Sequence, residues 1–171
     1  MNATPSNPSD HSHRSHEPRP RVLIVDDDAD LLDSMRRHLR SQFDVTVASS
    51  FKEAIQLVTS QGPFAVVVSD LRMPATDGAT LLFCVRMAAP ATVGILLTGH
   101  PDLESAMTVV NLGNAFRYLT KPCSPGVLVR ALEDSVERHR MILAGRITPA
   151  SPSQTEASQE GTPATPNPEV E

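Results

Sequence analysis

The chain has 171 residues, of which 40% are apolar and only 4% aromatic, and it contains no tryptophan. This length suits one domain of modest size with some additional chain, and its core should be aliphatic. A net charge of -5 gives no electrostatic reason to bind nucleic acid, and no apolar run is long enough to span a membrane. Polar residues follow Met1 directly, so we expect no signal peptide and a cytoplasmic protein.

Composition separates a central segment from two polar ends. Residues 1–19 are rich in proline and almost free of large apolar side chains, and residues 147–171 repeat this composition without any Lys or Arg. Such segments bury too little surface to fold, so we predict two disordered arms around one domain at residues 20–146. Cys84 and Cys123 lack Cys or His neighbours at metal-ligand spacing, and we interpret them as small buried apolar residues.

Within residues 20–146, short apolar runs alternate with helical patterns. The runs typical of strands are 21–25, 43–48, 64–69, 92–97 and 116–119. A helical pattern follows each run, with start signals at Asp28, Asp102 and Pro125 and stop signals at Gly62, Pro90, Gly113 and Gly145. Five strands, each followed by a helix, predict an α/β fold: a parallel sheet with right-handed crossovers and helices on both faces.

The third of these strands carries the most information. Five consecutive apolar residues, 64–68, indicate a strand buried on both faces, and the run ends at the acidic residue Asp70. Pro74 and Gly78 then bound a loop at the carboxyl end of the strand, which is where open α/β sheets bind their ligands. A carboxylate in this place favours a chemical role over a structural one.

In a parallel sheet the carboxyl ends of all strands lie at one edge, so residues that end different strands become neighbours. These residues are Asp26, Asp27, Asp70, Thr98 and Lys121. Three adjacent carboxylates repel one another by up to about 4 kcal/mol per pair at an effective dielectric constant near 20, so they require a cation or a raised pKa. Oxygen ligands at an exposed edge favour Mg²⁺. With an ammonium and a hydroxyl group alongside, the site suits a phosphoryl group, with Asp70 as the nucleophile.

Four motifs in this order, VLIVDDD, VSDLRMPATDG, LLTGH and YLTKP, resemble the receiver domain of bacterial two-component response regulators. The resemblance covers residues 20–146. It implies a flavodoxin-like fold, with a five-stranded parallel sheet and helices on both faces. It also implies a phosphoryl donor, either a sensor histidine kinase or a phosphotransfer protein.

The resemblance assigns a role to each residue at the predicted edge. It makes Asp70 the phosphoacceptor, while Lys121 neutralises the added charge and Thr98 bonds a phosphoryl oxygen. Movement of Thr98 would open a space into which the switch aromatic, Tyr118, can turn, and this would repack the surface of the fourth helix, fifth strand and fifth helix. The Lys121–Pro122 bond is expected to be cis, from the resemblance alone.

The metal ligands also follow from the resemblance. Asp27, Asp70 and the backbone carbonyl of Arg72 would bind Mg²⁺ directly, and Asp26 would bind it through water. Asp28 remains for the ordinary role of capping the next helix.

Three functional interpretations remain. The first is a single-domain response regulator: a phosphoacceptor rather than an enzyme, which acts on an unidentified protein partner through its own surface because nothing after Arg146 is expected to fold. The second is a hydrolase with an aspartyl-phosphate intermediate, which would need an acid two residues after the nucleophile, where Arg72 stands. The third is an interaction module that is never phosphorylated, which would not need the full set of side chains. A homodimer through the fourth and fifth helices is compatible with the resemblance.

Overall fold

The computed structural model describes residues 18–74, 76–99 and 115–149. In these ranges the chain alternates strands and helices in the predicted order. The elements are β1 (Arg21–Val25), α1 (Ala29–Leu39), β2 (Asp44–Ala48), α2 (Phe51–Gln61), β3 (Val66–Asp70), α3 (Gly78–Ala88), β4 (Val93–Thr98), β5 (Arg117–Thr120) and α5 (Pro125–Leu143). The predicted helix after Asp102 and most of the two predicted arms lie outside the described residues.

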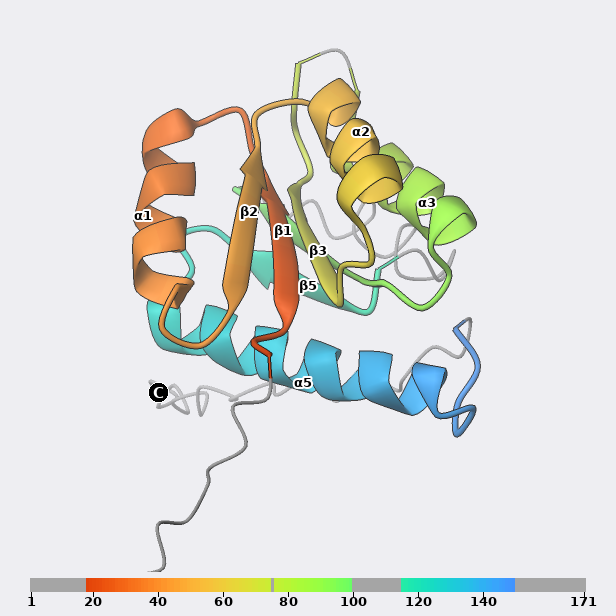
Figure 1. Ribbon diagram of the computed structural model, residues 1–171. Coiled ribbons are helices and arrows are strands. Elements are labelled where there is room, and N and C mark those ends of the chain that lie inside the picture. Colours follow the sequence, from red (N-terminus) through yellow and green to blue (C-terminus); the bar gives the residue numbers. More distant parts are fainter. Residues whose placement is uncertain (1–17, 75, 100–114, 150–171) are drawn as a thin grey trace, which may run out of the picture.

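The five strands form one parallel sheet in the order β2-β1-β3-β4-β5. Figure 1 shows α1 and α5 against one face of this sheet and α2 and α3 against the other. The predicted three-layer α/β fold is therefore confirmed. No helix in the described ranges is both long enough and apolar enough to cross a membrane.

The core lies in two aliphatic layers, one on each face of the sheet, because alternate strand residues point to opposite faces. Val22, Val68 and Leu132 belong to the layer under α1 and α5, whereas Val67 and Leu81 belong to the layer under α2 and α3. Every residue of β3 is buried, as a strand covered on both faces requires.

Several predicted details differ from the structure: β2, β4 and β5 begin one residue later than predicted, and β4 and β5 also end one residue later. The third strand begins at Val66 instead of Phe64, because Ala65 lies in a bend. Ala65 nevertheless forms backbone hydrogen bonds to both neighbouring strands. The strand also includes Asp70, one residue beyond its predicted end. The two cysteines are free thiols, as expected, but Cys84 and Cys123 are only partly buried.

Local signals explain where the helices begin. Asp28 accepts a hydrogen bond from the Leu31 N–H at 3.0 Å, which confirms it as the N-cap of α1. At the other end of the domain, Ser124 caps α5 and Pro125 occupies its first turn, where the missing N–H costs nothing.

Candidate functional site

The predicted site residues meet at the carboxyl edge of the sheet. Asp26 and Asp27 directly follow β1, Asp70 ends β3, Thr98 ends β4 and Lys121 directly follows β5. The parallel register brings these strand ends level with one another. Their convergence was expected from the order of strands and helices, and the structure confirms it.

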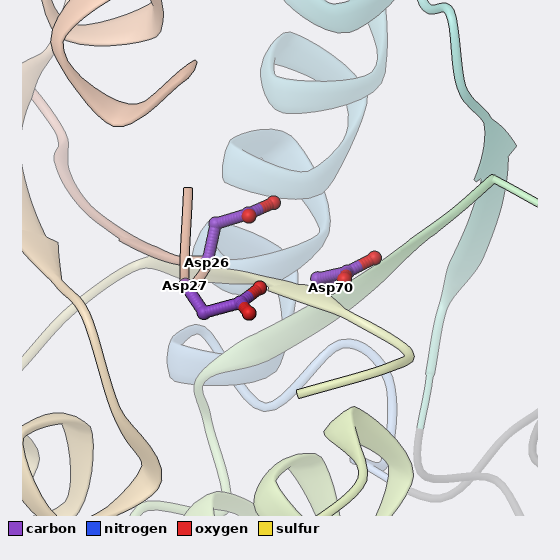
Figure 2. A group of neighbouring side chains, drawn as sticks. All are labelled: Asp26, Asp27 and Asp70. Carbon is purple, nitrogen blue, oxygen red and sulfur yellow. The ribbon is translucent and has the colours of Figure 1, made fainter. Parts of the chain in front are cut away.

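The three carboxylates form one acidic cluster, in which Asp26, Asp27 and Asp70 each place an oxygen within 4.8 Å of the others. Figure 2 shows Asp26 and Asp27 reaching this cluster from one segment and Asp70 from another. Asp26 is 1% exposed and Asp70 7% exposed, while Asp27 is open to solvent. A donor set made only of carboxylate oxygens, accessible from one side, fits a hard divalent cation such as Mg²⁺.

Lys121 points into the cluster. Its Nζ lies 2.6 Å from Oδ2 of Asp26 and 3.1 Å from Oδ1 of Asp70. Its backbone N–H donates to the carbonyl of Thr98 at 2.6 Å, so the end of β5 is fixed against the end of β4. The Lys121–Pro122 bond is cis, as the resemblance implied. One ammonium thus contacts two buried carboxylates, in the geometry of strong charge-assisted hydrogen bonds.

Burial and charge act against each other at this site. Burial raises the pKa of Asp70 above its ordinary value of 3.8, and the nearby charge of Asp26 adds to this, although Lys121 partly opposes it. Burial alone would lower the pKa of Lys121, but its hydrogen bonds to Asp26 and Asp70 outweigh that effect and the pKa is raised. The lysine therefore stays charged, and Asp70 holds a proton more tightly than an exposed aspartate does.

The three consecutive acids after β1 have three different environments. Asp26 turns inward, where Oδ1 accepts a hydrogen bond from the Asp28 N–H at 3.0 Å and Oδ2 accepts one from Lys121. Asp28 caps α1, and Asp27 remains exposed beside the cluster. Of the three acids, Asp27 is thus the one whose side chain is most open to a ligand from solvent.

The loop between β3 and α3 is held by backbone bonds at both ends. The Leu71 N–H donates to the carbonyl of Leu97 at 2.7 Å, and the Gly78 N–H donates to the carbonyl of Leu71 at 2.9 Å. Asp77 caps α3 by accepting from the Thr80 N–H at 2.7 Å. Arg72 is exposed in this loop, two residues after Asp70.

Sequence reasoning missed one polar contact at the end of β3. Ser69 is fully buried, and its Oγ donates to the backbone carbonyl of Asp70 at 2.9 Å. The available signal was a single polar residue that interrupts the apolar run VVV just before Asp70.

The two predicted switch residues lie on adjacent strands. Thr98 is 1% exposed at the end of β4, and Tyr118 lies on β5 opposite Leu96. The Tyr118 ring packs against the core layer on the α2 and α3 side. Its hydroxyl is buried, and among the described residues it has no hydrogen-bond partner. A buried hydroxyl without a partner costs free energy in this side-chain position.

The sequence also resembles known proteins over the same region. The profile of the response regulator receiver domain matches residues 22–133. The hydrogenase transcriptional regulatory protein HoxA of Cupriavidus necator is 36% identical over 116 residues, which are 68% of this chain and 24% of that protein. The C4-dicarboxylate transport transcriptional regulatory protein DctD of Rhizobium meliloti is 32% identical over 84% of this chain and 30% of its own length. The chain thus spans less than a third of these two relatives.

Solved structures share the fold over most of their own length. A response regulator receiver domain from Clostridium thermocellum aligns with a TM-score of 0.67 and 28% identity, over 72% of this chain and 98% of that one. The signal receiver domain of an HD domain-containing protein from Pseudomonas fluorescens Pf-5 has the same TM-score and 33% identity, over 71% of this chain and 98% of that one. With the matching sequence profile, these likenesses show that the chain belongs to the family of response regulator receiver domains.

Proposed function

We propose that this receiver accepts a phosphoryl group on Asp70 from a phosphohistidine of a sensor histidine kinase or phosphotransfer protein, in a reaction that requires Mg²⁺. The observation that carries the proposal is the contact of Lys121 with both Asp26 and Asp70 beside an acidic cluster. A structural ion pair would need one carboxylate. Three carboxylates beside one ammonium leave an excess of negative charge that a bound cation would balance.

The chemistry assigned to each residue follows from its position. An Oδ of Asp70 forms the new bond to phosphorus while the bond from phosphorus to the donor imidazole nitrogen breaks. Lys121 donates to a phosphoryl oxygen, and the Thr98 hydroxyl donates to another. Asp26, Asp27, Asp70 and the carbonyl of Arg72 would hold Mg²⁺, which when bound supplies positive charge against the phosphoryl oxygens.

The signal would be a change of the receiver surface. In the proposal, Thr98 moves toward the phosphoryl group and Tyr118 changes position behind it, which biases the surface formed by β5 and α5. The downstream protein that would read this surface is unidentified. The predicted fourth helix, which would form part of a dimer with α5, lies outside the described residues, so the homodimer stays a prediction.

The single-domain form is likewise our proposal. The curated relatives are much longer proteins, and the expectation that this receiver acts alone comes from the polar composition of residues 147–171. The domain boundaries at residues 20 and 146 and the cytoplasmic location also stay predictions. A hydrolase is less well supported, because the position two residues after Asp70 carries Arg72 and not an acid.

We expect the full chain to gain the mass of one phosphoryl group when it is incubated with acetyl phosphate and Mg²⁺. Chelation of Mg²⁺ should prevent the gain, because the acidic cluster then repels the incoming phosphate oxygens. Intact-mass spectrometry measures both conditions. An unchanged mass with Mg²⁺ present would refute the phosphoacceptor proposal, whereas sustained turnover of phosphate esters would favour the hydrolase.

The switch can be followed without a label, because Tyr118 is the only tyrosine and the chain has no tryptophan. We expect tyrosine emission to change when Asp70 is phosphorylated, since the environment of the unpaired hydroxyl changes. A Thr98→Ala variant should still gain the phosphoryl group, but its emission should change much less. Equal changes in both proteins would contradict the coupling of Thr98 to Tyr118.

A further inference from the structure

Two residues, Ser69 on β3 and Gly78 at the start of α3, contact the backbone carbonyl of Asp70 and not its side chain. Ser69 is 0% exposed, and its Oγ donates to the Asp70 carbonyl at 2.9 Å. Gly78, the first residue of α3, lies against the same oxygen: a Cβ at this position would be 1.9 Å from the Asp70 carbonyl and 2.7 Å from the Ser69 hydroxyl. No side chain fits there, so the start of α3 can approach β3 only as glycine.

The Asp70 carbonyl needs this hydroxyl because the pairing with β1 stops one residue earlier. The register of β1 with β3 ends at Val25 opposite Ser69. On the other side, β4 takes its bond from the Leu71 N–H. A buried backbone carbonyl at the end of a ladder is costly without a donor. Ser69 supplies that donor from the same strand.

Gly78 also fixes the next carbonyl along the chain. The Gly78 N–H donates to the carbonyl of Leu71 at 2.9 Å, so the carbonyls of Asp70 and Leu71 are both held at the start of α3. The carbonyl that follows is that of Arg72, the backbone ligand in the proposed Mg²⁺ site. Its direction depends on the torsions that Ser69 and Gly78 restrain.

We propose that Ser69 and Gly78 are positioning residues that aim the Arg72 carbonyl and the Asp70 carboxylate at the metal. This inference rests on the proposed function and extends it to two residues that would touch neither metal nor phosphoryl group. Groups that orient metal ligands typically contribute roughly 10–100-fold to metal affinity.

The test compares Mg²⁺ binding by full-length variants, measured by isothermal titration calorimetry. Ser69→Ala is expected to raise the Mg²⁺ dissociation constant about tenfold. Val67→Ala is the matched control, because Val67 is equally buried and lies on the same strand and face two residues earlier. It should lose stability without losing Mg²⁺ affinity. Ser69→Thr keeps the hydroxyl and should retain affinity close to that of the wild type.

A second pair of variants tests the glycine. Gly78→Ala must displace the Asp70 carbonyl and should weaken Mg²⁺ binding more than Ser69→Ala does. Gly126→Ala is its control, because a Cβ at Gly126 in the first turn of α5 meets nothing within 4 Å. Hydrogen exchange of the Gly78 amide in metal-free protein gives an independent result, and it should be faster in Ser69→Ala than in Val67→Ala.

The outcomes separate the two proposals. Equal Mg²⁺ affinities for Ser69→Ala and Val67→Ala, or a loss in Ser69→Thr as large as in Ser69→Ala, would overturn the positioning role. If Ser69→Ala does not fold, Ser69→Cys, which has a weaker donor of similar shape, replaces it. If the wild-type chain binds no Mg²⁺, the proposed function fails, while the Gly78 exchange rates still decide whether Ser69 holds the loop.

Discussion

An Asp70→Asn variant is expected to gain no phosphoryl group from acetyl phosphate and Mg²⁺ under conditions that modify the wild-type chain fully. The amide has no charged oxygen to attack phosphorus, and it removes one of the three carboxylates of the acidic cluster. Intact-mass spectrometry over a time course measures the loss, which should be complete within detection.

Asp77→Asn is the matched control for this substitution. Asp77 is an exposed acid in the same loop, where it caps α3, and asparagine caps helices as well as aspartate does. The control variant should therefore be modified at the wild-type rate. A phosphoryl group that persists in Asp70→Asn would show that Asp70 is not the acceptor. An equal loss in Asp77→Asn would show that the loss is not specific to Asp70.

The same variant has a consequence for stability without metal. Because the pKa of Asp70 is raised in the folded protein, the folded state binds this proton more tightly than the unfolded chain does. Above the pKa of Asp70 in the folded protein, its ionised carboxylate therefore lowers the free energy of unfolding. This loss disappears as the pH falls from the folded pKa toward the ordinary value of 3.8. Urea unfolding of metal-free Asp70→Asn should lack this pH dependence, and the variant should be more stable than the wild type at neutral pH.

The alternation of apolar runs and helical patterns was sufficient to predict the sheet, its faces and the meeting of acids with Lys121 at one edge. These features follow from the local periodicity of the sequence and from the parallel direction of the strands, which the regular alternation of strands and helices implies. The capping role of Asp28 was also predictable, since only one of three consecutive acids is needed as a cap.

Contacts that depend on how elements pack could not be predicted in this way. The bond from Ser69 to the Asp70 carbonyl exists because the pairing with β1 stops one residue short of Asp70. The burial of the Tyr118 hydroxyl depends on which core layer its ring enters. Nor does the sequence decide which of Asp26 and Asp27 turns toward the lysine, because strand alternation only places them on opposite sides.

Lys121→Met is expected to have the second large effect. The wild-type ammonium contacts Asp26 and Asp70, whose side chains are 2% and 10% exposed, so its removal leaves two buried carboxylates facing each other. Breaking a buried ion pair costs roughly 3–5 kcal/mol of unfolding free energy, and about 3 kcal/mol is expected here because the lysine side chain is 24% exposed. Phosphorylation by acetyl phosphate should slow by roughly 10²-fold, since a charged donor to the phosphoryl oxygens is lost.

The chain provides its own control for this change, because Lys52 is the only other lysine. Lys52 is exposed on α2, so Lys52→Met alters the net charge identically and should change stability by no more than about 0.5 kcal/mol.

The loss of stability in Lys121→Met should also depend on pH. Lys121 helps to keep Asp70 ionised, so the deficit in unfolding free energy should shrink as the pH falls and Asp70 is protonated. Added Mg²⁺ should reduce it as well, because a second cation then faces the same carboxylates. Urea unfolding measures both dependences. If Lys121→Met unfolded like Lys52→Met at every pH, the ammonium would not be balancing the acidic cluster, and the electrostatic basis of the proposed site would be wrong.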